Sequence, residues 1–273
     1  MEHKMSKLDD VFSNFWETYT KNNPHVTKIH NLLLKEGEIV ENDHIALRTF
    51  NDPRVNIDRL SRLFIAQGYK EAGEYHFKEK KLYAKHFEHE DESQPKIFIS
   101  ELLLEEFSQE LQQVVKTSID QIPHDILHAE SLPWAQLVWG PIKHELYQRL
   151  LKESEYAAWV YAFGFQANHF TVNVNALKKY DTLEKLNEFL KSKKVTLNSS
   201  GGEIKGSTEV GLEQSSTMAG KIDVTFLEGI FKIPSCYYEF AQRYEVDGKL
   251  YTGFVASSAD KIFESTNKSG AVA

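Results

Sequence analysis

Two histidines, His44 and His169, lie inside apolar segments of the sequence, next to Ile45 and Phe170. A histidine in such a segment is usually a hydrogen-bonded core residue, but these two fall at equivalent places in two similar runs of expected elements. Imidazoles that project from both runs into one cup could share a metal ion. Glu239 is the candidate third ligand because it is flanked by aromatic residues, and a carboxylate there is costly unless it is paired, hydrogen-bonded or metal-bound.

The donor set leaves several chemistries open. Two histidines and one carboxylate with open positions form the ligand set of non-haem Fe(II) oxygenases. Glu101 is the loose counterpart of Glu239 in the first run, and a set with both glutamates would better suit an isomerase, lyase or hydrolase. A salt bridge from Glu239 to Arg243 or Lys221 would need no metal, and the cup would then be a metal-free binding module.

Arg48 follows His44 by four residues, and positions i and i+4 of a strand lie on the same face. A guanidinium binds a carboxylate in a bidentate fork. Arg48 could therefore hold an acidic group of a ligand at His44, although a surface ion pair explains the spacing equally well.

The other histidines of the eleven in the chain fall in less suggestive places. His86 and His89 lie in a charged stretch, which predicts a solvated surface. His124 and His128 have the i, i+4 spacing that can bind metal on a helix, but no HExxH pattern accompanies them. We expect these four residues to be dispensable for turnover.

Composition restricts the class of protein. The chain has 273 residues, and 32 basic against 40 acidic residues give a net charge of −8. Such a balance disfavours general binding to nucleic acid or to an anionic membrane. The polar N-terminus and the absence of a long apolar stretch predict neither signal peptide nor membrane span. A single cysteine, Cys236, favours a reducing compartment, so we expect a cytoplasmic protein.

The periodicity predicts an α+β fold in which the order strand, helix, three strands occurs twice. In the first run, residues 44–50 alternate as a strand, a helical pattern follows, and three strands are expected within 69–101. A strand over 165–174 opens the second run and is followed by a helix and a Gly/Ser-rich loop over 198–207. The later strands of the second run are expected at 209–218, 222–227 and 236–246. We predict N-terminal helices over 1–40, a first βαβββ module over 41–102, a helical insertion over 103–163, and a second module with the C-terminal segment over 164–273. The two modules would form a cupped sheet surrounded by helices.

Four motifs give the chain a resemblance to a known family. They are His44-x-x-x-Arg48, Gln166-x-Asn168-His169-Phe170-Thr171, Glu239-Phe240-x-Gln242-Arg243 and Ser258-Ala259-x-x-Ile262-Phe263-x-Ser265. With these motifs the chain resembles the DUF1338 family of 2-oxoadipate dioxygenase/decarboxylases, which have a vicinal-oxygen-chelate-type fold. The resemblance spans roughly residues 40–265.

The resemblance implies a reaction and a set of residue roles. The partners would be a 2-oxo acid, most specifically 2-oxoadipate, and dioxygen, and the products would be 2-hydroxyglutarate and carbon dioxide. The Fe(II) ligands would fall on His44, His169 and Glu239, and the substrate-binding arginine on Arg48. The resemblance also implies a main-chain contact to substrate near Ser257 and Ser258, and a segment over 214–216 that lines the pocket.

Overall fold

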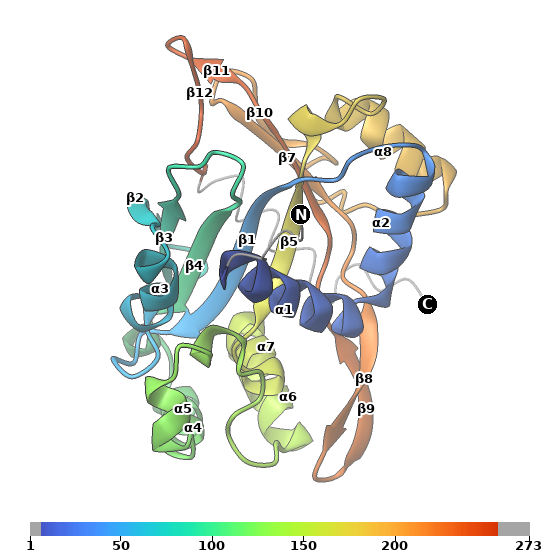
Figure 1. Ribbon diagram of the computed structural model, residues 1–273. Coiled ribbons are helices and arrows are strands. Elements are labelled where there is room, and N and C mark those ends of the chain that lie inside the picture. Colours follow the sequence, from blue (N-terminus) through green and yellow to red (C-terminus); the bar gives the residue numbers. More distant parts are fainter. Residues whose placement is uncertain (1–6, 256–273) are drawn as a thin grey trace, which may run out of the picture.

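The computed structural model describes residues 7–255, and its largest element is an eight-stranded sheet that curls through the molecule (Figure 1). The strand order is β2 (Lys70–Phe77), β3 (Leu82–Glu88), β4 (Lys96–Leu102), β1 (Asn42–Phe50), β5 (Ala167–Asn173), β10 (Glu239–Arg243), β7 (Leu212–Ser216) and β6 (Lys205–Ser207). β1 and β5 meet antiparallel in the middle of the sheet. The α+β class predicted from the sequence is confirmed.

Each half of the sheet has its first strand parallel to its last. β1 pairs with β4 in the first half, and β5 pairs with β10 in the second. Parallel neighbours need a crossover connection. Helix α3 (Ile57–Ala66) follows β1 and helix α8 (Leu183–Ser192) follows β5, so the predicted order of strand, helix and further strands is present in both halves.

The second half departs from the prediction in its last strands. The segment predicted as a strand over 222–227 forms β8 (Lys221–Phe226), which pairs with β9 (Gly229–Pro234) in a separate hairpin outside the main sheet. Its place in the sheet is taken by β6, inside the stretch predicted to be a loop. Gly206 allows this pairing, because its backbone has a φ of +90° and a Cβ there would lie 2.1 Å from the carbonyl oxygen of Leu212.

The remaining elements are mostly helical. They are α1 (Lys7–Asn22), α2 (Pro24–Lys35), η1 (Leu104–Glu106), α4 (Gln109–Asp120), α5 (His124–His128), η2 (Leu132–Trp134), α6 (His144–Glu153), α7 (Glu155–Phe163), η3 (Val174–Ala176), β11 (Glu245–Val246) and β12 (Lys249–Leu250). The insertion predicted as helical over 103–163 ends in two helices, α6 and α7. Ser154 separates them because its backbone is extended and its hydroxyl accepts a hydrogen bond from the Ala157 amide at 3.1 Å, which caps α7.

Helices α1 and α8 cover one face of the sheet. The rings of Trp16 and Tyr19 pack on Phe170 of β5, with centroids 5.0 and 5.2 Å apart. The hydroxyl of Ser215 on β7 bonds to Asn187 of α8 at 2.8 Å. Because neighbouring residues of a strand point to opposite faces, the candidate ligands adjacent to Ile45, Phe170 and Phe240 point to the other face.

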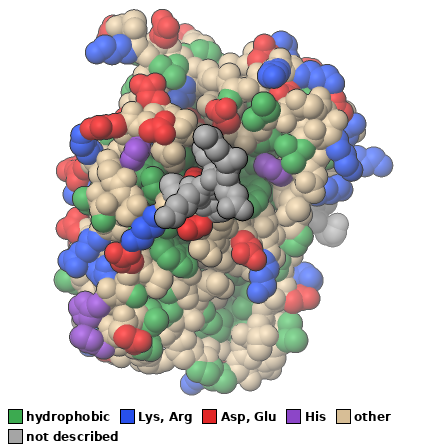
Figure 2. All heavy atoms as spheres, in the orientation of Figure 1, with side chains coloured by type: hydrophobic (Ala, Val, Ile, Leu, Met, Phe, Trp, Pro, Cys, Tyr) green, Lys and Arg blue, Asp and Glu red, His purple; other side chains and the backbone are tan. Residues whose placement is uncertain are grey.

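Charged side chains of both signs are mixed on the face of the molecule that Figure 2 shows. Around the edge of the face in Figure 2, both basic and acidic side chains are present, and hydrophobic side chains are visible nearer its middle. No helix within residues 7–255 is both long enough and apolar enough to cross a membrane.

Candidate active site

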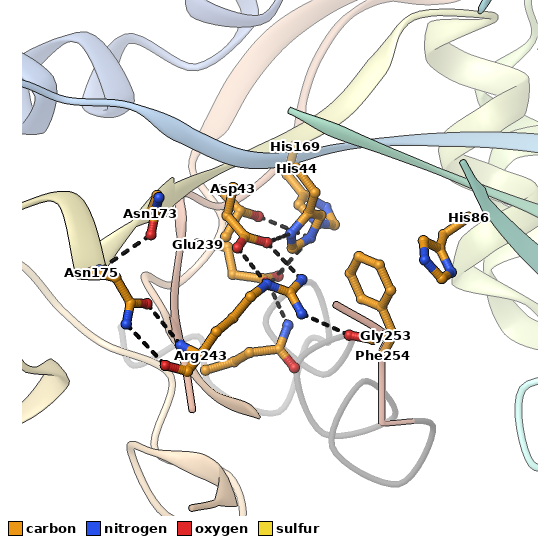
Figure 3. Close-up of polar contacts among 12 residues, drawn as sticks. Asp43, His44, His86, His169, Asn173, Asn175, Glu239, Arg243, Gly253 and Phe254 are labelled. Carbon is orange, nitrogen blue, oxygen red and sulfur yellow. Dashed lines mark hydrogen bonds and ion pairs between the residues drawn. The ribbon is translucent and has the colours of Figure 1, made fainter. Parts of the chain in front are cut away.

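His44, His169 and Glu239 form a buried cluster on one face of the sheet (Figure 3). The Nε2 atom of His44 lies 3.5 Å from one carboxylate oxygen of Glu239, and the Nε2 atom of His169 lies 3.3 Å from the other. Ligand atoms bound at about 2.1 Å around an octahedral ion stand about 3 Å apart. The three side chains therefore fit one metal ion with small adjustments, and their donor set suits a first-row divalent metal.

The strand register explains how three distant residues meet. His44 on β1 faces Thr171 on β5, and Glu239 on β10 faces Thr171 from the other side. His169 lies two residues before Thr171, on the same face of β5. The three central strands thus bring the candidate ligands to neighbouring positions on the curved sheet.

Each histidine is oriented by the residue that precedes it. The register between β1 and β5 shifts at Asp43 and again at Asn168. Asp43 accepts a hydrogen bond from Nδ1 of His44 at 2.7 Å, and Asn168 accepts one from Nδ1 of His169 at 2.8 Å. Donation from Nδ1 leaves the lone pair of Nε2 of each ring as the atom that can bind a metal, and Nε2 of His44 accepts a hydrogen bond from the Thr171 hydroxyl at 3.1 Å in its place. Sequence reasoning gave Asp43 no role, although an oxygen-bearing residue before each strand histidine was a usable signal.

Burial dominates the electrostatics of the cluster. Burial raises the pKa of Glu239 to about 8, and it lowers the pKa of His44 and of His169 below the ordinary value. Both imidazoles are thus held neutral, and the charge of Arg243 and the hydrogen bond from Gln214 favour the charged form of the carboxylate less than burial opposes it. A bound divalent cation would add positive charge and reverse the effect on the carboxylate.

Polar neighbours complete the surroundings of Glu239. The side-chain amide of Gln214 donates to Glu239 at 2.6 Å, so the segment expected to line the pocket does reach the cluster. The metal-free alternative of a salt bridge between Glu239 and Arg243 is wrong. Arg243 instead binds both carboxylate oxygens of Asp43, at 2.6 and 2.9 Å, in a buried pair.

Arg48 is buried beside α7, so the alternative of a surface ion pair is wrong. Its side chain is 3% exposed, and its guanidinium carbon lies 4.9 Å from the centre of the Tyr156 ring and 5.4 Å from that of Trp159. A cavity of about 590 Å³ has Arg48 and Tyr156 in its wall. The candidate ligands do not line this cavity, whereas Arg48 lies in its wall and on the same face of β1 as His44.

Tyr156 is itself fixed by the two strands that flank Arg48. Its hydroxyl accepts from the amide of Thr49 at 3.0 Å and donates to the carbonyl oxygen of Ser100 at 2.6 Å. Ser100 lies opposite Arg48 in the pairing of β1 with β4. The aromatic wall of Arg48 is therefore anchored to the sheet that carries the arginine.

The comparison with known proteins agrees with this geometry. Residues 6–249 match the sequence model of the 2-oxoadipate dioxygenase/decarboxylase family. The chain belongs to this family. A chloroplastic 2-oxoadipate dioxygenase/decarboxylase from Arabidopsis thaliana is 36% identical over 250 residues, which cover 82% of this chain and 67% of the plant protein.

Two solved structures are similar in fold over nearly the whole chain. The hydroxyglutarate synthase of Oryza sativa in complex with 2-oxoadipate has a TM-score of 0.88 and 32% identity, covering 97% of this chain and 95% of the rice chain. A protein from Shewanella frigidimarina named as a hydrolase has a TM-score of 0.87 and 50% identity, covering 92% of this chain and 99% of the other. The predicted family resemblance is confirmed.

Other residues considered for the site of this 2-oxoadipate dioxygenase/decarboxylase family member fall elsewhere. Glu101 accepts a hydrogen bond from the Ile57 amide at 2.9 Å, at the start of α3, and it lies opposite Thr49, on the other face from Arg48. Glu101 as a fourth ligand is therefore wrong. Ser257 and Ser258, where the family resemblance implies a substrate contact, lie outside the described residues.

His86 and the two histidines of α5 lie outside the cluster of candidate ligands. His86 is 2% exposed and bonds to Tyr75 at 2.8 Å and to Glu88 at 2.9 Å, so its predicted surface position is wrong. Lys85 lies on the opposite face of β3 and bonds to Glu71, whereas His86 shares its face with Glu88 and is buried. Within residues 7–255, the grouping of three or more potential metal ligands comprises His44, His169 and Glu239, and it does not include the α5 histidines.

Proposed function

We propose that this chain converts 2-oxoadipate and dioxygen to 2-hydroxyglutarate and carbon dioxide, with Fe(II) held by His44, His169 and Glu239. The atoms balance, because one carbon leaves as carbon dioxide while one oxygen atom of dioxygen enters the new carboxylate and the other enters the new hydroxyl group. The observation that carries the proposal is the buried cluster of two imidazoles and one carboxylate on adjacent strands. The names of the family and of its plant members supply the substrate class.

The protein side chains orient the reactants and keep water out. When bound, Fe(II) would supply coordination positions for the 2-oxo acid and for dioxygen, together with the electrons that activate oxygen. Asp43 and Asn168 hold the two imidazoles with Nε2 toward the ion. Gln214 holds one oxygen of Glu239, and the buried surroundings exclude solvent that would compete for the open positions.

Arg48 is proposed to bind the distal carboxylate of the substrate. The faces of Tyr156 and Trp159 stabilise its charge, and a carboxylate would add the bidentate partner that a guanidinium favours. Four strand residues span about 13 Å between Cα atoms. A dicarboxylate whose 2-oxo group binds an ion at His44 would therefore extend along the strand toward Arg48. Fixing both ends would place the keto carbon for reaction.

The architecture also supports a finer assignment. We propose that residues 41–102 and 164–273 are βαβββ modules of the vicinal-oxygen-chelate type, the second interrupted by the β8–β9 hairpin. Residues 1–40 and 103–163 would then be helical additions. The main-chain substrate contact near Ser257 and Ser258 and the cytoplasmic location remain predictions.

Oxygen uptake with a panel of acids tests the proposed reaction. The protein is purified without oxygen, loaded with Fe(II), and given 2-oxoadipate, 2-oxoglutarate, 2-oxohexanoate or adipate. We expect the fastest uptake with 2-oxoadipate and none with adipate, which lacks the keto oxygen. Product formation without oxygen would favour a metal-dependent hydrolase, lyase or isomerase instead, and the absence of bound metal would favour a binding module.

A further inference from the structure

Residues Tyr251–Phe254, which we call the strap, lie against the candidate metal site (Figure 3). The ring of Phe254 meets the ring of His44 edge to face, with centroids 4.8 Å apart and planes at 89°. Phe254 is 6% exposed and also packs on Phe98 of β4 at 4.8 Å. The strap therefore closes one side of the His44 imidazole with an apolar ring.

Arg243 connects the strap to the surroundings of His44. Its Nη1 atom donates to the carbonyl oxygens of Tyr251 and Gly253, at 3.1 and 2.8 Å. Through Nε and Nη2 the same guanidinium binds both oxygens of Asp43, at 2.6 and 2.9 Å. Asp43 in turn accepts the Nδ1 proton of His44. One planar group thus fixes the strap and the residue that orients a candidate ligand.

The position of Arg243 in the sheet is itself rigid. It lies on β10 four residues after Glu239, and therefore on the same face. The side chain of Asn175 brackets its main chain, accepting from the Arg243 amide at 2.8 Å and donating to its carbonyl oxygen at 2.9 Å. A change in the strap is therefore transmitted to the guanidinium contacts rather than absorbed by movement of the backbone of Arg243.

A second anchor attaches the strap to the other half of the sheet. The amide of Phe254 donates to the hydroxyl of Tyr75 on β2 at 3.1 Å. The same hydroxyl bonds to the buried His86 at 2.8 Å, and His86 bonds to Glu88 at 2.9 Å. The strap is consequently held from both halves of the sheet above His44.

We infer that Arg243 is a positioning residue that couples the placement of the strap to the orientation of His44 through Asp43. The inference rests on the proposed function, in which His44 binds the metal. If the strap leaves its place, Arg243 loses two acceptors and its hold on Asp43 changes. If Asp43 is altered, Arg243 loses its ion pair and the strap loses a fixed donor.

Metal affinity tests one direction of the coupling. Co(II) is titrated into metal-free Arg243→Lys, which keeps a positive charge but cannot reproduce the planar fork. We expect its affinity to fall by about 10- to 100-fold, the effect typical of residues that orient a metal ligand. Arg59→Lys is the matched control, because the buried Arg59 also donates to two main-chain carbonyls, those of Leu127 and Ala129, at 2.7 and 3.0 Å. The control should bind Co(II) as wild type does.

Hydrogen exchange tests the other direction on the metal-free protein. Asp43→Asn can still accept from His44 but cannot form the ion pair with Arg243. We expect the amides of the strap to exchange about tenfold faster than in wild type, because Asp43 bonds to Arg243, which holds the strap. Exchange at Tyr251–Phe254 unchanged from wild type would overturn the inference, as would Co(II) affinity of Arg243→Lys within about twofold of wild type.

Failure of this inference can be distinguished from failure of the proposed function. If His44→Ala binds Co(II) as tightly as wild type does, the metal site is misassigned and the proposed function fails. If His44→Ala loses Co(II) while Arg243→Lys keeps it, only the coupling fails. If Arg243→Lys does not fold, Asp43→Asn decides the inference alone.

Discussion

His169→Ala should yield a folded protein that retains less than about a tenth of the iron bound by wild type. The reason is that loss of one of three protein ligands removes a bond that the remaining two cannot replace, and ligand loss costs more than the 10- to 100-fold typical of the residues behind the ligands. His44→Ala and Glu239→Ala should behave alike. Iron per chain, measured after anaerobic loading and desalting, checks the expectation.

His124→Ala is the matched control for these three variants. It removes an imidazole from α5 that lies outside the cluster of His44, His169 and Glu239, so iron content should equal that of wild type. Thermal unfolding of each metal-free variant separates loss of metal from loss of fold. Iron content unchanged in any of the three ligand variants would remove that residue from the site, and loss of iron in His124→Ala would show that the cluster is misassigned.

Arg48→Ala should lower kcat/KM for 2-oxoadipate roughly 30- to 1000-fold. This corresponds to a loss of about 2–4 kcal/mol of transition-state stabilisation, the cost of removing one partner of a desolvated charge pair. Bound iron should persist, because the guanidinium is not a ligand. Arg48→Lys should recover part of the loss, since an ammonium cannot form the planar fork. Steady-state kinetics with iron content measured on the same samples tests these expectations.

A substrate analogue that lacks the distal carboxylate identifies which group of the substrate Arg48 binds. 2-Oxohexanoate has the chain length of 2-oxoadipate but lacks the distal carboxylate. If Arg48 binds that carboxylate, wild type should discriminate strongly between the two acids, and Arg48→Ala should discriminate much less. Equal discrimination by both proteins would place Arg48 at the carboxylate beside the keto group. Kinetics of Arg48→Ala equal to wild type would return Arg48 to a purely structural role.

The candidate ligands could be predicted from the sequence because residues adjacent to them in the chain define their environment. Alternation around His44 and His169 identified strands, and aromatic neighbours made the carboxylate of Glu239 conspicuous. The family motifs then connected these positions. The order of the elements in both halves was predictable for the same reason, since it depends on periodicities of two and of 3.6 residues.

The missed features depend on pairing between distant strands. The register shifts at Asp43 and Asn168 exist only when β1 meets β5, and no periodicity within either strand marks them. His86 was assigned to the surface from its charged neighbours, but β3 turns this residue inward to Tyr75. Beyond its place in a family motif, Arg243 was considered only as a partner for Glu239, because its actual partner, Asp43, is remote in sequence.

The stoichiometry of the reaction, measured on the Fe(II)-loaded protein, tests the central claim most directly. Oxygen consumed, carbon dioxide released and 2-hydroxyglutarate formed are measured together from 2-oxoadipate, with His169→Ala under the same conditions. The account predicts that the three amounts are equal for wild type and that His169→Ala gives none above the buffer control. Carbon dioxide or 2-hydroxyglutarate formed without matching oxygen uptake, or turnover by His169→Ala at the wild-type rate, would contradict it.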